Sequence, residues 1–419
     1  MHTLHGTFTM ETNFFETNNA YDLIAQYGSP LYVYNENILR SRCKDMKHLV
    51  SYENFVPHYS IKANTNIHLL KIVHEEGLHA DVMSPGEIFL ALKSGFKPDE
   101  LFFIPNNVVA EDMKYAIEHG ITTSVDSLEQ LKLYGQLNPG GKVAIRFNPG
   151  VGAGHHEKVV TGGKKTKFGV NPEYIPEVKR ILETYHLTLV GINQHIGSLF
   201  MDSKPYIESL SSILKIAKAF DDLEFIDLGG GFGIPYHKQD GEARLDIKML
   251  GKALDPILHN FAEEYGKKVQ FQIEPGRYIP CEAGLLLGQI TGTKTNADHK
   301  YLGCDIGFNA LQRPIMYDSH HDIEIYSQEN KDTTLVPLTV VGNICESGDI
   351  LAKDRMLPQS TSYGDLIAIM DAGAYGYSMA SCYNQRFRPA EVLICTDGTL
   401  KQIRNRDTFE DLIRNMLSF

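Results

Sequence analysis

The sequence lacks the features that mark several classes of protein. It carries 40 basic and 52 acidic residues, a net charge of −12, so no basic excess is present to neutralise nucleic-acid phosphates. No apolar run approaches the length of a membrane-spanning helix. The first residues contain neither Lys nor Arg and have no apolar core, so they do not resemble a signal peptide. We therefore expect the chain to be neither a nucleic-acid-binding protein nor a membrane-spanning protein.

Cysteine is scarce as well. The chain has six cysteines in 419 residues, and no two of them form a CxxC pair. They are Cys43, Cys281, Cys304, Cys345, Cys382 and Cys395. This usage argues against a disulfide framework and against a zinc knuckle. It indicates a soluble protein of a reducing compartment, and we expect it to be cytoplasmic.

The composition is sufficient for a large folded core. Hydrophobic residues make up 42% of the chain and charged residues 22%, which is ordinary globular usage and excludes disorder as the main state. At roughly 100–200 residues per domain, the length suggests two or three domains. No fixed-period repeat of the solenoid kind is present.

Residues 36–285 alternate between short apolar runs and helical patterns. Strand-like runs are expected at 55–61, 79–82, 101–104, 122–125, 143–147, 187–192, 225–228 and 269–273. Such alternation is typical of parallel βαβ units, and about eight units in 250 residues fit a (β/α)8 barrel. A doubly wound sheet fits the same pattern and stays open. The long glycine-rich loop Gly150–Gly169 is of a length typical of functional loops.

The pattern changes after residue 285. Strand-like runs at 286–293, 300–306, 322–326, 334–341, 366–370 and 392–396 are separated by Gly, Asn, Asp and Pro, and helical patterns are scarce until 407–417. Residues 286–419 are therefore predicted to form a β domain, a sandwich or barrel. Residues 1–35 are too few for a domain and are expected to pair with it.

Three sites at predicted strand ends could carry chemistry. Lys62 follows an apolar strand, and a lysine with a lowered pKa forms Schiff bases with carbonyl groups. The glycines of 229–233 allow backbone N–H groups to approach an anion such as phosphate, although the pattern is not GxGxxG. Glu274 could hold a cation and Arg277 could clamp a carboxylate or phosphate. A surface lysine, a plain tight turn and a structural Glu–Arg pair remain open alternatives.

Other motifs are weaker taken singly. His195 at a strand end is most often structural, but in a cleft it could stack on a flat ring, with Ser198 donating to a phosphate. Cys345 stands beside acidic residues, which raise a thiol pKa and disfavour a nucleophile. Tyr375 lies in a run of small residues that favours close backbone packing. The adjacent pair His320–His321 is a poor bidentate metal site, because neighbouring residues of a strand face opposite ways. No metal is expected.

The order of these motifs is more specific than any one of them. Nine stand in sequence: YSIKAN (59–64), DVMSPGE (81–87), KFGV (167–170), HIGS (195–198), GGGFG (229–233), EPGR (274–277), RPIMY (313–317), CESGD (345–349) and GAYGYSMAS with RPAEV (373–391). With them the chain resembles the fold type III, alanine-racemase-like decarboxylases that use pyridoxal 5′-phosphate. The resemblance runs from about residue 30 to 391 and is strongest to the diaminopimelate decarboxylases.

The resemblance implies a (β/α)8 barrel, a C-terminal β domain and a homodimer with shared active sites. It implies Lys62 as the Schiff-base lysine and Cys345, reaching the site from the partner subunit, as a second catalytic residue. The implied cofactor-binding residues are Lys62, Asp81, His195, Ser198, Gly231, Gly233, Glu274, Gly276, Arg277 and Tyr375. The implied substrate-binding residues are Arg277, Arg313, Tyr317, Glu346 and Tyr375.

The resemblance also implies the reaction. Loss of carbon dioxide from meso-diaminopimelate would give L-lysine, with a protonated pyridine ring as the electron sink. Two arginines and Glu346 suit the second amino-acid centre of that substrate. A decarboxylase of ornithine, lysine or another diamino acid is the alternative. Leu199, Pro85 and the Asn343–Ile344 pair depart from the usual family pattern and bear on substrate preference.

Overall fold

The computed structural model describes residues 1–150 and 167–417. Most of the expected Gly150–Gly169 loop, 151–166, lies outside the described residues. The chain divides into two compact units. The barrel unit comprises Arg40–Ile234 and Arg244–Ile279, and the sheet unit comprises Met1–Leu39, Pro235–Ala243 and Pro280–Phe419. The sequence pattern contained no sign that the short segment Pro235–Ala243 groups with the sheet unit.

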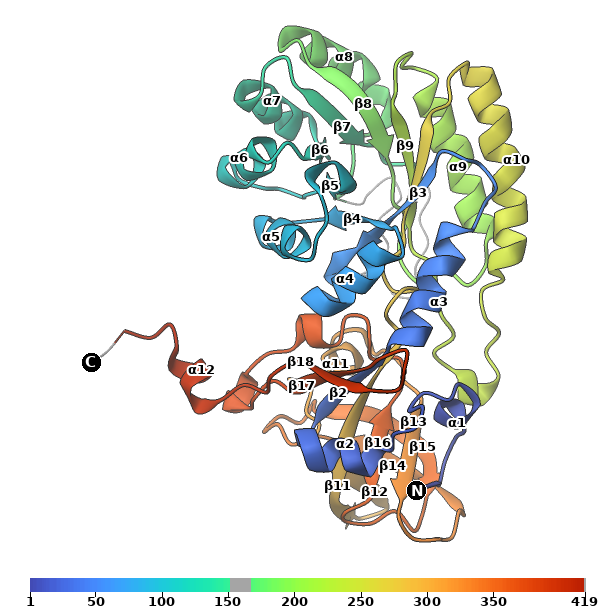
Figure 1. The fold of residues 1–419 in the computed structure, drawn as a ribbon, viewed down its shortest axis with the longest axis vertical. Helices are drawn as coiled ribbons and strands as arrows, with labels where there is room; N and C mark the ends of the chain where they lie inside the picture. The colour runs from blue at the N-terminus through green and yellow to red at the C-terminus, as the bar shows by residue number, and fades with distance from the viewer. Residues whose placement is uncertain (151–166, 418–419) are drawn as a thin grey trace. The chain divides into compact units, whose positions relative to one another are not determined.

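Eight parallel strands of the barrel unit close into a ring (Figure 1). They are β3 (Phe55–Ser60), β4 (His79–Val82), β5 (Leu101–Phe103), β6 (Thr122–Val125), β7 (Lys142–Arg146), β8 (Thr188–Asn193), β9 (Phe225–Gly230) and β10 (Gln270–Glu274). The ring closes where β10 pairs with β3, with Phe271 opposite Phe55. Because a doubly wound sheet has two open edges, this pairing excludes that alternative, and the predicted barrel is confirmed.

Helices lie outside the ring of strands (Figure 1). They are α3 (Glu36–Lys47), α4 (Ile67–Glu75), α5 (Pro85–Lys93), α6 (Ala110–Glu118), α7 (Leu128–Leu137), α8 (Ile175–Thr184), α9 (Lys204–Ala217) and α10 (Ile247–Tyr265). Their starts are encoded locally, because Asn66, Ser84, Ser127 and Asp246 each accept a hydrogen bond from a first-turn backbone N–H. Gly266, in the left-handed conformation, ends α10.

Aromatic and aliphatic side chains fill the barrel. Phe102 of β5 meets Phe225 of β9 edge to face at 5.1 Å, although these strands are not neighbours, so the contact crosses the interior. Ile104, Ala144 and Val190 pack in the same cluster. This layer of side chains makes the barrel a packed core that supports polar groups at the carboxyl ends of the strands.

The sheet unit is built on one ten-stranded, mostly antiparallel sheet. Its strands are β1 (His2–Thr3), β2 (Leu31–Asn35), β11 (Gly284–Asn296), β12 (His299–Cys304), β13 (Ile323–Ser327), β14 (Leu335–Val341), β15 (Ile350–Pro358), β16 (Leu366–Ile369), β17 (Ala390–Ile394) and β18 (Leu400–Arg404). Its helices are α1 (Phe8–Glu11), α2 (Ala20–Tyr27), α11 (Arg313–Tyr317) and α12 (Phe409–Ile413). The expected second, β-rich part is therefore confirmed. Strands β15 and β18 were not predicted, because charged residues interrupt their apolar pattern.

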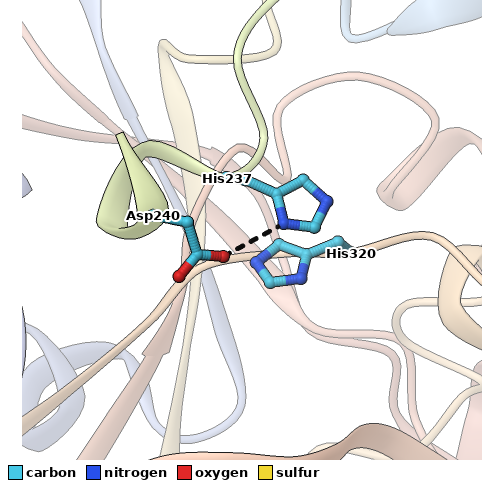
Figure 2. Close-up of side chains that lie close together, drawn as sticks. All are labelled: His237, Asp240 and His320. Atoms are coloured by element: carbon cyan, nitrogen blue, oxygen red, sulfur yellow. Dashed lines mark hydrogen bonds and ion pairs between the residues drawn. The ribbon is translucent and has the colours of Figure 1, made fainter. Parts of the chain in front are cut away.

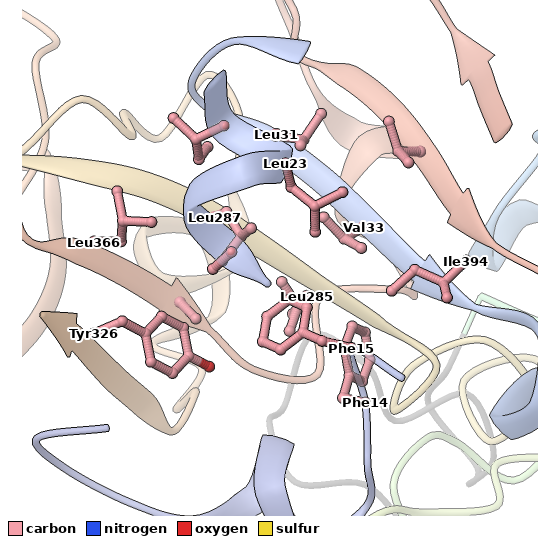
Figure 3. Packing of buried hydrophobic residues seen from close by; sticks show 14 of the residues in the cluster. Phe14, Phe15, Leu23, Leu31, Val33, Leu285, Leu287, Tyr326, Leu366 and Ile394 are labelled. Atoms are coloured by element: carbon pink, nitrogen blue, oxygen red, sulfur yellow. The ribbon is translucent and has the colours of Figure 1, made fainter. Parts of the chain in front are cut away.

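The N-terminal segment is part of the sheet unit's core. Strand β2 pairs with β11 on one side and β17 on the other. Phe14 and Leu23 pack with Val33, Leu285 and Ile394 in one buried cluster (Figure 3). Residues from both ends of the chain thus share a core, which explains why the first residues need no domain of their own.

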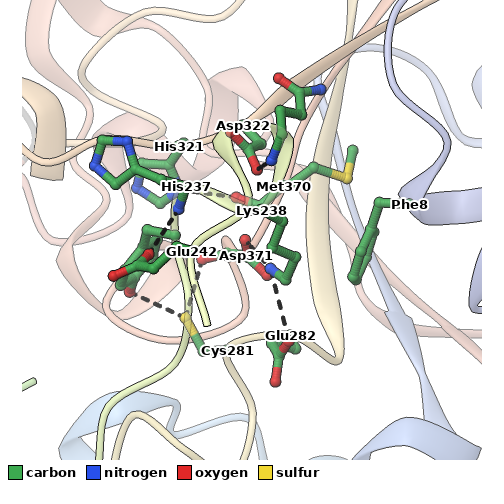
Figure 4. A network of polar contacts seen from close by, with 12 residues as sticks. Phe8, His237, Lys238, Glu242, Cys281, Glu282, His321, Asp322, Met370 and Asp371 are labelled. Carbon is green, nitrogen blue, oxygen red and sulfur yellow. Dashed lines mark hydrogen bonds and ion pairs between the residues drawn. The ribbon is translucent and has the colours of Figure 1, made fainter. Parts of the chain in front are cut away.

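A polar network ties the segment Pro235–Ala243 to the rest of the sheet unit (Figure 4). The Nζ atom of Lys238 lies 2.5 Å from Oδ2 of Asp371 and 3.6 Å from Oε1 of Glu282. The Cys281 thiol donates to the Asp371 carbonyl oxygen at 3.1 Å. Burial raises the pKa of Asp371 to about 7, although the neighbouring Lys238 cation acts to lower it. The network fixes Asp371, the first residue of the run of small residues at 371–378 that contains Tyr375.

Among the described residues, none of the helices combines the length and apolar character needed to span a bilayer.

We expect His58 to make the barrel sensitive to acid. Its ring is 3% exposed and packs edge to face against His79 and Phe102, and burial holds its pKa well below the ordinary value. The unfolded chain therefore binds a proton below about pH 6.5 that the folded chain does not, so stability falls with falling pH. His58→Phe should reduce this loss by up to about 1.4 kcal/mol per pH unit.

Urea unfolding of the two proteins between pH 5 and 7.5 checks this prediction. His259→Phe on helix α10, where the ring is half exposed, serves as the control. Parallel pH profiles for the native chain and His58→Phe would contradict it.

Candidate functional site

Polar side chains gather where the barrel strands end. Lys62 lies in a single 3-10 turn, η1 (Ile61–Ala63), directly after β3. The Tyr59 hydroxyl donates to the Asn64 carbonyl oxygen at 3.1 Å, which fixes the course of this turn. The Ser60 hydroxyl donates to the buried Asp81 carboxylate at the end of β4. Burial raises the Asp81 pKa, while Lys62 and that hydrogen bond oppose the rise. Lys62 therefore lies within the electrostatic reach of a buried carboxylate.

His195 follows β8 and is held as a neutral ring. The Gly230 N–H donates to its Nδ1 atom at 3.2 Å, so Nδ1 carries no proton. Burial, with the Arg146 and Lys62 cations, holds the His195 pKa well below its ordinary value. The Glu274 carboxylate lies 3.7 Å from Nδ1, too far for a hydrogen bond, and with a neutral imidazole this contact is not an ion pair. An uncharged flat ring suits stacking better than charge pairing.

The glycine-rich turn after β9 packs directly on neighbouring backbone. A Cβ on Gly230 would collide with the Glu274 carbonyl oxygen, and one on Gly231 would meet the Gly197 carbonyl oxygen. Gly231 also has a φ of +106°, which side chains rarely adopt. The Phe200 N–H donates to the Gly231 carbonyl at 3.0 Å, and Gly233 N–H donates to Phe200 at 3.0 Å. The turn is thereby locked to the HIGS segment that carries Ser198.

The EPGR segment completes this edge of the barrel. Arg277 is 6% exposed, and its Nη2 donates to the Ser198 hydroxyl at 3.0 Å. Gly276 precedes it in a tight turn, where the Ile279 N–H donates to the Gly276 carbonyl at 3.2 Å. Glu274 ends β10 with one buried carboxylate oxygen that no described residue hydrogen-bonds. Burial, then Asp227 and Asp81, raise the Glu274 pKa well above its usual range.

The structure thus brings together eight of the residues singled out in the sequence, with Gly233 in the same turn. They are Lys62, Asp81, His195, Ser198, Gly231, Glu274, Gly276 and Arg277, all in the barrel unit. Arg313, Tyr317, Cys345, Glu346 and Tyr375 belong to the sheet unit and are described within it.

Arg313 is the most constrained of those five. It is 1% exposed, and its Nε donates to the His321 ring at 3.2 Å while its guanidinium lies over the Tyr236 ring at 5.0 Å. Tyr317 ends the same short helix, α11. A guanidinium held on two sides points in one direction, which suits recognition of a planar carboxylate.

The CESGD turn has a structural acid as well as exposed groups. Cys345 and Glu346 are exposed, and the Tyr383 hydroxyl donates to the Glu346 carboxylate. Asp349 is buried, and its two oxygens accept N–H bonds from Ile344 at 2.7 Å and Phe308 at 2.8 Å. The last acid of the motif therefore shapes the turn that presents the first two residues.

Tyr375 lies in strained backbone. Its φ is +55°, and Asp371 four residues earlier has the same value. Non-glycine residues in this conformation are uncommon and are retained where the surroundings impose them. Gly373 and Gly376 allow close packing there, because a Cβ on Gly373 would collide with the Pro280 carbonyl oxygen and one on Gly376 with that of Ala372.

Two charged residues at the barrel mouth, by which we mean the carboxyl ends of the barrel strands, were assigned no role from the sequence. Arg146 ends β7, is 7% exposed, and has its guanidinium carbon 4.5 Å from the Phe168 ring centre. Asp227 of β9 is fully buried and accepts the Gly229 N–H at 2.8 Å. Charged residues at the ends of apolar strands were the available signal, since such groups are rarely buried without function.

One cluster in the sheet unit has ligand atoms close enough for a cation: His237, Asp240 and His320 (Figure 2). The His237 ring stacks on that of His320 at 3.7 Å. Arg355 places guanidinium nitrogens 3.0 Å from both ring nitrogens of His320. A metal ion would have to displace that cation, so the cluster is better explained as a hydrogen-bonded stack.

Comparison with known proteins gives a consistent result. A family model described as "Pyridoxal-dependent decarboxylase, pyridoxal binding domain" matches residues 36–281. The diaminopimelate decarboxylase of Methanothermobacter thermautotrophicus is 40% identical over 405 residues, covering 94% of this chain and 93% of the relative. That of Escherichia coli K12 is 32% identical, covering 98% of each chain. The crystal structure of the Helicobacter pylori diaminopimelate decarboxylase complexed with L-lysine superposes with a TM-score of 0.86 at 31% identity, covering 94% of this chain and 98% of that one.

A barrel with this mouth and this family match defines a class: the chain belongs to the pyridoxal-dependent decarboxylases. Within that class, its near-full-length relatives place it in the diaminopimelate decarboxylase family. The expected resemblance is confirmed.

The described residues fit a pyridoxal group. Glu274 directs a buried carboxylate oxygen without a described hydrogen-bond donor, which suits a protonated ring nitrogen. The glycine turn at Gly231 packs on the Gly197 carbonyl, close to the Arg277–Ser198 pair, and this setting of glycine backbone, hydroxyl and guanidinium suits a phosphate. Lys62 follows the strand next to β10, as a covalent anchor requires.

Gly231→Ala should weaken pyridoxal phosphate binding by tenfold or more, about 1.4 kcal/mol. The added Cβ meets the Gly197 carbonyl and the Phe200 ring, so the turn must move away from Ser198. Equilibrium titration of cofactor-free protein measures the dissociation constant. Gly266→Ala, also at positive φ but with open space around the added carbon, is the matched control. Equal affinity for Gly231→Ala and the native chain would contradict the prediction.

Proposed function

We propose that this chain uses pyridoxal 5′-phosphate to decarboxylate meso-2,6-diaminopimelate, giving L-lysine and carbon dioxide. The observation that carries the proposal is the convergence of Lys62, His195 and Glu274 at one barrel mouth. It is supported by full-length relatives that are named diaminopimelate decarboxylases.

Each residue expected to bind the cofactor has a role in the proposal. Lys62 anchors the cofactor and, beside Asp81, exchanges protons with the substrate amine. His195 stacks on the ring as a neutral imidazole, and Glu274 holds the ring nitrogen. Ser198, Gly231, Gly233, Gly276, Arg277 and Tyr375 surround the phosphate. When bound, the protonated ring serves as an electron sink for the pair left by carbon dioxide.

The substrate's second amino-acid centre needs both cationic and anionic partners. In the proposal Arg277, Arg313, Tyr317 and Tyr375 bind its carboxylate side, and Glu346 binds its ammonium group. The fixed guanidinium of Arg313 supports this, because a buried fork left unpaired by a shorter diamine would reject that diamine.

We also propose a homodimer in which each subunit supplies Cys345 and Glu346 to its partner's site. Exposure of both residues supports this assignment. Cys345 or Lys62 returns the proton to the carbon that lost carbon dioxide. A cytoplasmic location is supported by the six cysteines, all of which lie among the described residues and none of which forms a disulfide there.

Lys62 is testable directly. Borohydride reduction of the native holoprotein should fix the cofactor to the peptide that contains Lys62, as detected by mass spectrometry. Lys62→Ala should retain no fixed cofactor and lose more than about a thousandfold in carbon dioxide release. Lys71→Ala, an exposed lysine of helix α4, is the control. Fixation at another lysine would overturn the assignment.

Substrate choice is tested by carbon dioxide release from meso-diaminopimelate, L-ornithine, L-lysine and D-lysine. Only meso-diaminopimelate should react efficiently. Arg313→Lys keeps the charge but loses the planar fork, so kcat/KM for this substrate should fall roughly 100-fold, about 2.7 kcal/mol.

Arg414→Lys, in an exposed ion pair beyond helix α12, should leave the rate unchanged. Efficient release from L-ornithine or L-lysine instead would favour the alternative, a decarboxylase of shorter or monocarboxylate diamino acids.

A further inference from the structure

Two buried acids lie on adjacent strands of the barrel. Asp227 is on β9 and Glu274 ends the neighbouring strand β10. Asp227 pairs with Gln272 in the strand register, and Glu274 is two residues further along, on the same face. Asp227 is fully buried and Glu274 is 6% exposed. Two acids on adjacent strands are thus held together away from water.

One carboxylate oxygen of each acid is buried without a hydrogen-bond donor in the described part of the chain. One Asp227 oxygen accepts the Gly229 N–H, and its Oδ2 has no partner among the described residues. Oε1 of Glu274 likewise has no hydrogen-bond partner among the described residues. The two carboxyl groups are nevertheless within hydrogen-bonding reach of each other. Two ionised carboxylates cannot form a hydrogen bond with each other, because neither has a proton to donate. A protonated carboxyl group can donate to a carboxylate.

The surrounding charges do not neutralise both acids. Arg146 faces both acids and Lys62 faces Glu274, but Arg146 also faces Asp81 and Asp126, and Lys62 also faces Asp81. His195 is neutral, and the Tyr206 hydroxyl is kept protonated by burial and by both acids. Burial raises the Asp227 pKa to about 7 and raises the Glu274 pKa well above its ordinary value, with each acid acting on the other. One proton between the pair relieves this repulsion.

We propose that Asp227 and Glu274 share a single proton, which makes Asp227 the positioning residue for Glu274. With a cation in front of Glu274, the proton resides on Asp227, whose hydroxyl donates to the Glu274 carboxylate and leaves Oε1 for that cation. The pair then carries one negative charge, and Glu274 is oriented with an oxygen towards that cation. The identity of the cation as a pyridinium nitrogen rests on the proposed function, whereas the shared proton does not.

The shared proton has a specific infrared signature in cofactor-free protein. The carbonyl stretch of a protonated carboxyl group absorbs at a higher wavenumber than the stretches of an ionised carboxylate. An amide at either position donates an N–H to the remaining acid, so that acid can stay ionised without the shared proton. Asp227→Asn and Glu274→Gln should therefore each remove the same protonated-carboxyl band at neutral pH, although each variant keeps one acid. Asp255→Asn, which removes a carboxylate of lowered pKa on helix α10, should leave the band intact. A band lost in only one variant, or in neither, overturns the proposal.

A second measurement does not require the Asp227 variant to fold. The folded native pair keeps a proton that the unfolded acids release above about pH 5, so the folded state binds one proton more than the unfolded state. The unfolding equilibrium constant should then rise tenfold more per pH unit in the native protein than in Glu274→Gln between pH 5 and 7. Equal slopes overturn the proposal.

Cofactor binding separates a positioning role from a purely structural one. The amide introduced by Asp227→Asn retains a donor to Glu274, whereas the methyl group introduced by Asp227→Ala does not. Asp227→Asn should bind pyridoxal phosphate within threefold of the native chain, and Asp227→Ala at least tenfold more weakly. If Asp227 acts as a carboxylate, both variants weaken binding equally, which overturns the proposal. None of these readouts uses carbon dioxide release, so a wrong substrate assignment leaves them unchanged.

Discussion

The glycine turn after β9 packs closely against the backbone on both of its sides. The positions of the other residues at the barrel mouth depend on this contact. Gly230 lies against the Glu274 carbonyl, and Gly229 and Gly231 lie against the HIGS segment. Any side chain at these positions would separate strands β8, β9 and β10. The same contact lets the Gly230 N–H reach His195, and so sets that ring's tautomer as well as its place. Backbone packing therefore decides the electrostatic state of the site.

The mouth concentrates charge that a barrel would otherwise exclude. Asp81, Asp227, Glu274 and Arg146 are all buried there above the packed layer of Phe102 and its neighbours. Burying such groups is unfavourable unless they pair or share protons. Their altered pKa values are consistent with a site whose chemistry depends on where protons reside. The apolar layer below keeps water out and keeps these interactions strong.

The sheet unit follows a different plan, in which loops are held by single anchoring residues. Asp349 fixes the turn that exposes Cys345 and Glu346, and His321 holds Arg313. The Lys238–Asp371 pair fixes the start of the strained run containing Tyr375. The barrel presents its polar residues from strand ends, whereas here they lie on short turns over a large sheet.

Local sequence determined most of the secondary structure. All eight barrel strands and the starts of several helices could be predicted, because strand periodicity, caps and glycine stops act within a few residues. Closure of the ring was decided only by the pairing of β10 with β3, more than 200 residues apart in sequence. The same holds for Pro235–Ala243 and for β15, whose charged residues conceal its strand character. Lys62, His195 and Glu274 stood out from motif order, but Asp227 and Arg146 did not. Their significance comes from burial and from neighbours on other strands, and the tertiary structure alone supplies both.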